Sequence, residues 1–275
     1  MRLLFGVVLL CACTVYDPVD DVPHHEVAGA RAAMQLILDE VGDAKVYAIG
    51  EYHPSRKHAG KRSPLQRFTS EIVDLLVPRA QHLVLETWST DACGRAVTAE
   101  VAQTLGRPAS TTTDMEALKM RSARARLQTH GLPITCIEHD SLLDGMGRVD
   151  FLRLLLLVTE KLAETTRRLA AGDRAVIVYG GALHNDLYPR WPLEDLSYAH
   201  VLDRELPGAV VEVDLVVPEI VAPMPLIRNE PWFPLLGRAT PERTLVWQRG
   251  PRSYVVILPA ADYETRKVAL PVASL

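Results

Sequence analysis

Two short loops with the pattern Gly-x-x-His carry the residues best suited to chemistry in this sequence. The first, Gly50–His53, follows the apolar run Val46–Ile49, and the second, Gly181–His184, follows the apolar run Ala175–Tyr179. A glycine directly after a strand permits a positive φ or a close backbone approach, and either would aim the histidine across the strand ends. Two such loops far apart in the chain favour one shared site over two isolated structural histidines.

Carboxylates accompany both loops, because Glu51 lies inside the first and Asp186 lies just after the second. Three further apolar runs end in a carboxylate: Leu83–Leu85 before Glu86, Ile134–Ile137 before Glu138, and Val210–Val213 before Asp214. In open α/β sheets, ligands bind outside the carboxyl ends of the strands. We therefore predict one pocket at that edge, formed by His53, His184, Glu51 and Glu86 and supported by Glu138 and Asp186.

Histidine beside carboxylate suits the activation of water. His53 or His184 would act as general base, and the glutamates would orient it. The same groups are ligands for zinc, manganese or iron, so a divalent metal on His53, His184 and Glu51 is a second way to the same reaction. The electrophile would be an ester or amide carbonyl. A serine nucleophile is not expected, because the chain has no Gly-x-Ser-x-Gly.

Apolar runs alternate with helical patterns along the chain, which predicts repeated strand–helix–strand units. The runs are short and rich in Val and Ile, as in strands covered on both faces. The expected helices lie between them, over Val27–Val41, Leu65–Leu76, Thr113–Thr129, Val149–Ala171 and Leu193–Leu206. Right-handed crossovers then give an α/β fold with a mostly parallel central sheet and helices on both faces.

Two segments depart from this alternation. Thr87–Leu132 is too long for one crossover, and we expect it to carry an extra helix pair that lies over the end of the sheet as a lid. Thr244–Gln248 and Ser253–Leu258 flank a Gly-Pro turn and predict an antiparallel hairpin at the sheet edge. Residues 26–275 are expected to form one α/β domain.

Residues 1–13 have the order of a bacterial lipoprotein leader. Arg2 is the only charge, Leu3–Leu10 is apolar, and the end of the run, Leu10–Cys13, resembles a lipobox. Cleavage before Cys13 and acylation of its thiol would anchor the chain in a lipid bilayer, with residues 14–25 as a polar tether. This predicts a domain outside the cytoplasm in the bacterial cell envelope. An ordinary secretory signal without lipid, or a buried strand, is the alternative.

Removing this leader leaves Cys93 and Cys136 as the unmodified thiols. Export implies an oxidising compartment, in which such a pair often closes, so we predict a disulfide between them. Two buried free thiols are the alternative.

The residues around the first loop resemble a known family. The Gly50–His53 loop, His58, and the later run ending in Glu86 are similar to the ChaN-like haem-binding lipoproteins. These share a superfamily with the Tiki and TraB metallopeptidase-like proteins and the erythromycin esterases, in which a second Gly-x-x-His matches Gly181–His184. The resemblance implies an α/β core with its site at the strand ends, where His53, His184, Glu51 and Glu86 would carry function. His58 would support haem binding.

Two classes of function follow. One is a hydrolase with a small-molecule or peptide substrate, and the other is a non-catalytic carrier of haem or iron, which needs only one or two axial ligands and apolar walls. Several convergent ionisable groups favour the hydrolase, whereas the lipid anchor and His58 favour the carrier. Nucleic acid is not an expected partner, because the net charge is −4 and no dense Lys/Arg run is present.

Overall fold

The structure is a computed structural model, and it describes residues 22–89, 106–108, 110–144, 146 and 148–260. The strands of this part are β1 (His25–Val27), β2 (Val46–Glu51), β3 (Ala80–Ser89), β4 (Gln128–Pro133), β5 (Ala175–Gly181), β6 (Val210–Val216), β7 (Thr244–Gly250) and β8 (Ser253–Ile257). They form one sheet in the order β1-β7-β8-β6-β2-β5-β3-β4. From β8 to β4 the neighbours are parallel, while β7 is antiparallel to β8 and to β1.

The sheet confirms the predicted α/β class, and the C-terminal pair β7–β8 confirms the antiparallel hairpin. Strand β8 adds to β6 in parallel, and the short β1 covers the outer side of β7. Val22 and His25, which were expected in the tether, already belong to the fold, because Val22 packs against the first core and His25 begins β1.

Helices connect the strands. The α-helices are α1 (Gly29–Val41), α2 (Pro64–Arg67), α3 (Val73–Leu76), α5 (Ser110–Arg124), α6 (Cys136–Asp140), α7 (Phe151–Ala170), α8 (Ala182–Asn185), α9 (Tyr198–Glu205) and α10 (Pro218–Val221). A π-helical segment, η2 (Phe68–Ile72), joins α2 to α3, and the 3₁₀ turns are η1 (Arg56–His58), η3 (Glu194–Leu196), η4 (Pro225–Ile227) and η5 (Phe233–Arg238).

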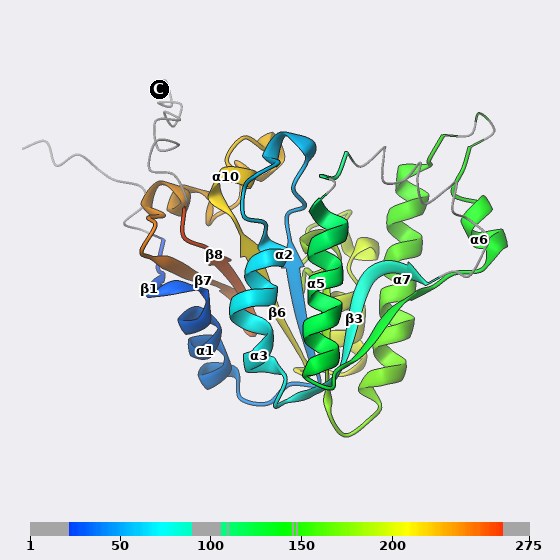
Figure 1. The fold of residues 1–275 in the computed structure, drawn as a ribbon, viewed down its shortest axis with the longest axis horizontal. Coiled ribbons are helices and arrows are strands. Elements are labelled where there is room, and N and C mark those ends of the chain that lie inside the picture. The colour runs from blue at the N-terminus through cyan, green and yellow to red at the C-terminus, as the bar shows by residue number, and fades with distance from the viewer. Residues whose placement is uncertain (1–21, 90–105, 109, 145, 147, 261–275) are drawn as a thin grey trace, which may run out of the picture.

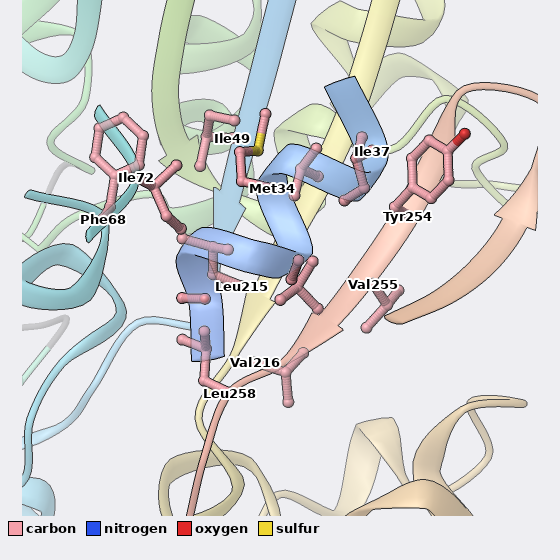
Figure 2. Close-up of a cluster of buried hydrophobic side chains, with 14 of the residues drawn as sticks. Met34, Ile37, Ile49, Phe68, Ile72, Leu215, Val216, Tyr254, Val255 and Leu258 are labelled. Atoms are coloured by element: carbon pink, nitrogen blue, oxygen red, sulfur yellow. The ribbon is translucent and has the colours of Figure 1, made fainter. Parts of the chain in front are cut away.

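Successive strand residues point to opposite faces, so each strand contributes to two cores. On the first face, residues such as Ile49 and Leu215 pack against Met34 of α1 and against Phe68 and Ile72 (Figure 2). Figure 1 shows α1, α2, α3 and α5 on this side of the strands. On the other face, strand residues from β2, β3, β5 and β6 pack against α7 and α9.

One predicted strand is wrong. Ile134–Ile137 is not a strand, because β4 ends at Pro133 and α6 begins at Cys136 after the capping residue Thr135. Ile134 is buried in the second core, but the side chain of Ile137 is 83% exposed, so the run is not a strand covered on both faces.

The long segment after β3 is described only in part. Its described helix, α5, packs Leu118 into the first core and contacts α2 and β4. The rest of the expected helix pair falls in residues 90–105, outside the described part.

Cys13 and most of the expected tether lie outside the described residues, so the lipid anchor stays a prediction. Among the described helices, none is long and apolar enough to cross a membrane.

Candidate functional site

The two Gly-x-x-His loops leave neighbouring strands at the centre of the sheet. Strands β2 and β5 pair in parallel, with Gly50 opposite Gly180 and Glu51 opposite Gly181. After β2 the chain continues into α2 on the first face, whereas after β5 it continues through α8 to α9 on the second face. Crossovers that diverge in this way mark the switch point at which open sheets bind ligands. The sequence prediction of one shared edge thus has its physical basis in the strand order.

His53 is held by Glu51 from the same loop. Its Nδ1 donates a hydrogen bond to Glu51 Oε1 over 2.6 Å, and Tyr179 Oη donates to Glu51 Oε2 over 2.5 Å. Glu51 and Tyr179 are both buried, so their geometry is fixed by the two central strands. The carboxylate therefore orients the imidazole and leaves Nε2 facing the strand ends, an arrangement like the acid–histidine pair of hydrolytic enzymes.

Gly181 is the point at which the predicted residues meet. Its backbone N–H donates to Glu86 Oε2 over 2.6 Å. A Cβ built on Gly181 would lie 3.0 Å from His53 Nε2, 3.4 Å from Glu86 Oε2 and 3.7 Å from His184 Cδ2. The structure thus brings together Glu51, His53, Glu86 and His184, all four of the principal residues predicted from the sequence.

His184 is held in one tautomer. Its Nδ1 lies 3.0 Å from the carbonyl oxygen of Leu196 and 2.8 Å from Thr159 Oγ1. Because a carbonyl oxygen only accepts, Nδ1 carries the proton and the lone pair is on Nε2. The unprotonated Nε2 is therefore the nitrogen of His184 that can accept a proton.

Arg107 completes the cluster and was not predicted. Its Nη2 donates to His53 Nε2 over 2.9 Å and lies 3.5 Å from Glu86 Oε1. The loop that carries it is fixed to the first Gly-x-x-His loop, because the Arg56 N–H donates to the Gly106 carbonyl oxygen. Arg107 Nε is buried and has no hydrogen-bond partner in the part of the chain that the structure describes.

The two histidines have pKa values shifted in opposite directions. Burial and the Arg107 charge lower the pKa of His53, but the hydrogen bond to Glu51 and the nearby Glu86 outweigh them and raise it above 6.5. Burial lowers the pKa of His184 below 6.5, and the charge of Glu86 offsets only part of this effect.

The two glutamates are ionised. Burial by itself would raise the pKa of each, but His53 and Tyr179 hold the pKa of Glu51 below its usual value. His53, His184 and Arg107 hold the pKa of Glu86 well below its usual range. The cluster therefore contains two ionised carboxylates, Glu51 and Glu86, beside His53 with a raised pKa and His184 with a lowered pKa.

Among the described residues, no group of three or more His, Cys, Asp or Glu side chains is arranged to hold a metal ion. Arg107 occupies the space at His53 Nε2, where a metal or a haem iron would bind. Binding of either group would require Arg107 to move, and both remain predictions.

Three residues predicted to support the site lie away from it. Glu138 caps α6 through Thr135 and pairs with Lys161 at 2.8 Å, which with the capping bonds lowers its pKa to about 2. It was misplaced because the run before it is not a strand. His58 bonds to Ser55 in a capping box at η1.

Asp186 is the third, and it joins a separate network with Arg249 on the second face of the sheet. Asp214 lies in the same network and is almost fully buried. Both residues are beside the His184 loop, but neither contacts the cluster around Gly181.

The structure describes one of the two cysteines of the predicted disulfide. Cys136 is disulfide-bonded at the start of α6. Cys93 lies outside the described residues, so its pairing with Cys136 stays a prediction.

No protein-family model matches the chain, and no curated protein sequence is similar to it. Among solved structures, "The structure of the type III effector HopBA1" is similar over 90% of this chain and 100% of that one, at 13% sequence identity and a TM-score of 0.45. A similarity of this size carries no argument about function, and the resemblance to the ChaN-like superfamily stays a prediction. The fold and cluster define an open α/β protein with a His/Glu/Arg group at the switch point.

Proposed function

We propose that this protein is a hydrolase that activates water for attack on an ester or amide carbonyl. The observation that carries the proposal is the convergence of His53, His184 and Glu86 on Gly181, with the pKa values of the two histidines shifted apart. Paired titratable groups with opposite shifts are the usual arrangement of a general acid and a general base.

The assigned roles follow from the protonation states. His184 is neutral, with its lone pair on Nε2, and takes a proton from water. His53 has the raised pKa and gives a proton to the leaving group from Nε2. Protonated Nε2 no longer accepts from Arg107, and Glu86 is the acceptor that remains within reach of the guanidinium. Glu51 keeps the His53 ring in place throughout.

Arg107 supplies positive charge for the oxyanion that forms on the attacked carbonyl. Its Nη2 is shared between His53 and Glu86, and its buried Nε lacks a partner among the described residues. A guanidinium at this position would stabilise the negative charge that develops on the attacked carbonyl oxygen. No step here requires a metal.

The test is hydrolysis of p-nitrophenyl esters and p-nitroanilides of varied acyl group, with His53→Gln, His184→Gln and His58→Gln. Loss of a general acid or base costs about 10²- to 10⁴-fold in rate. We expect such a loss for His53→Gln and His184→Gln and none for His58→Gln. Activity that survives both of the first two variants would contradict the proposal.

A haem titration separates this proposal from the carrier function. If no probe is hydrolysed and haem gives a Soret band that His53→Gln or His58→Gln removes, the protein is a carrier and the hydrolase proposal fails. Metal analysis of protein purified without chelator tests whether a divalent ion assists the reaction. If the purified protein contains a metal ion, and both His53→Gln and His184→Gln lose it, the metal ion supplies the positive charge that is assigned here to Arg107.

A further inference from the structure

A second polar network lies under the segment that follows His184. Arg249, near the end of β7, donates from Nη1 to Asp186 Oδ1 over 2.7 Å and to Glu212 Oε1 over 3.1 Å. Its Nη2 is 3.8 Å from Asp214 Oδ2. One guanidinium from the C-terminal hairpin thus contacts three carboxylates, one of which belongs to the His184 loop.

The network also binds the backbone of that loop. Glu212 Oε2 accepts from the Leu187 N–H over 3.0 Å, and Asp186 Oδ1 accepts from the Tyr188 N–H over 2.8 Å. Arg249 donates to both carboxylates, so it joins the segment directly after His184 to β6 and β7, in addition to the direct bond from Leu187 to Glu212.

Helix α8 is short, and Ser197 also holds its C-terminal end, because Ser197 Oγ donates to the carbonyl oxygens of His184 and Asp186. The helix has four residues and no side-chain cap at its N-terminus. It lies directly on Gly50, where an added Cβ would be 2.9 Å from Ala182 Cα and from Asn185 Nδ2 and would overlap Asp214 Oδ1. The network beneath α8 is therefore part of what sets the height of His184 above the sheet.

The burial of these acids makes Arg249 hard to replace. Glu212 and Asp214 are 0% and 1% exposed, so an ionised carboxylate here needs a cation or a proton. Burial raises the pKa of Glu212 to about 7 and that of Asp214 well above its usual value. The other charged or titratable groups that act on this pair are Asp186, Tyr52, Tyr188 and Tyr198. Arg249 is the cation among these groups.

We infer that Arg249 is a positioning residue for His184, and that the C-terminal hairpin acts on the site through Asp186 and Glu212. The expected effect of Arg249 on the reaction rate rests on the proposed function, whereas its expected effect on the His184 ring does not. It assigns a role to a hairpin that otherwise only extends the sheet. The His184 ring is held from the other side by Leu196 and Thr159, and the network fixes its backbone.

The experiment compares Arg249→Met with Arg249→Lys and with Arg243→Met, a matched control whose arginine pairs with Glu26 at the surface. The first readout is the His184 imidazole by ¹H–¹⁵N NMR, assigned with His184→Gln. We expect Arg249→Met to shift the His184 titration toward that of an ordinary histidine and to weaken its Nδ1–H signal. Arg249→Lys should preserve the His184 titration and the Nδ1–H signal in part, because lysine keeps the positive charge but lacks the paired N–H donors of the guanidinium. Arg243→Met should change neither the titration nor the signal.

The second readout is hydrolysis, where we expect Arg249→Met to lower kcat at least tenfold with KM little changed. If Arg249→Met does not fold, Arg249→Met/Glu212→Gln removes the cation together with one of its acids. A folded variant with an unchanged His184 titration and Nδ1–H signal overturns the inference and leaves the hydrolase proposal standing. A changed His184 signal in a protein without hydrolytic activity supports the inference and counts against the proposed function.

Discussion

Replacing Gly181 by alanine tests the geometry of the site with a single added methyl group. Gly181 has φ −68° and ψ 139°, a conformation that alanine adopts without strain. The new Cβ would lie 3.0 Å from His53 Nε2 and 3.4 Å from Glu86 Oε2. These neighbours are the ends of side chains, so they can move by a few tenths of an ångström. The expected result of Gly181→Ala is a folded protein with a displaced site.

The size of each effect follows from this geometry. A Gly→Ala change at a compatible position stabilises by about 0.4–1 kcal/mol through the unfolded chain, and the close contact with His53 offsets part of that gain. The free energy of unfolding should therefore stay within about 1 kcal/mol of the original value. A misplacement of 1 Å near the reacting atoms costs about 10²-fold, so a shift of a few tenths should lower kcat/KM by roughly tenfold.

Two further glycines provide controls. A Cβ on Gly237 meets nothing within 4 Å, so Gly237→Ala should leave stability and activity unchanged. A Cβ on Gly50 would overlap Asp214 and approach the Ala182 backbone, so Gly50→Ala should destabilise the fold by about 1–3 kcal/mol or more. Urea unfolding and p-nitrophenyl ester hydrolysis measure all three variants. A Gly181→Ala protein with unchanged kcat/KM and unchanged histidine titrations would refute the argument that the groups act together at this point.

Three other predictions concern pH, anchoring and the thiols. Activity should follow a bell-shaped pH profile, rising through a pKa below 6.5 as His184 loses its proton and falling through a pKa above 6.5 as His53 loses its own; in His184→Gln the acid limb should disappear, and a limb that persists there would reassign the base. Cys13→Ser should abolish lipid labelling and release the protein to the soluble fraction, whereas persistent membrane association would show that the leader was misinterpreted. Denatured, oxidised protein lacking residues 1–13 should show no free thiol if Cys93 pairs with Cys136, and two free thiols would exclude that bond.

The central parallel strands, the main helices and the β7–β8 hairpin follow from patterns of the sequence, whereas the outermost strands β1 and β4 do not. β2, β5 and β6 are buried on both faces, so their apolar runs identify them. β4 has one neighbour, and its residues Gln128–Pro133 are mostly polar or partly exposed, so it has no such run. The apolar stretch Ile134–Ile137 after β4 has the composition of a buried strand, although the Ile137 side chain faces solvent. An edge strand is defined by its pairing rather than by its composition.

The candidate site divides in a similar way. Its histidines and glutamates follow strands, and strand ends can be located from local patterns. Arg107, Thr159 and Tyr179 come from a loop, a helix and a strand interior. No local signal distinguishes them from any other arginine, threonine or tyrosine, because each reaches the site only through the tertiary arrangement. Arg107, Thr159 and Tyr179 therefore follow from the fold, whereas Glu51 and Glu86, which also set the histidine pKa values, could be located from the strand ends.

The opposite pKa shifts of the two histidines have their origin in the strand order. His53 follows β2, whose chain turns to the first face and keeps the imidazole beside Glu51 and Glu86. His184 follows β5, whose chain turns to the second face and places the imidazole against α7 and η3, where its Nδ1 contacts only neutral oxygens. The same residue type is thus basic on one side of the switch point and kept neutral on the other. The proposed assignment of His53 as acid and His184 as base therefore rests on the different surroundings that the two crossovers give these residues.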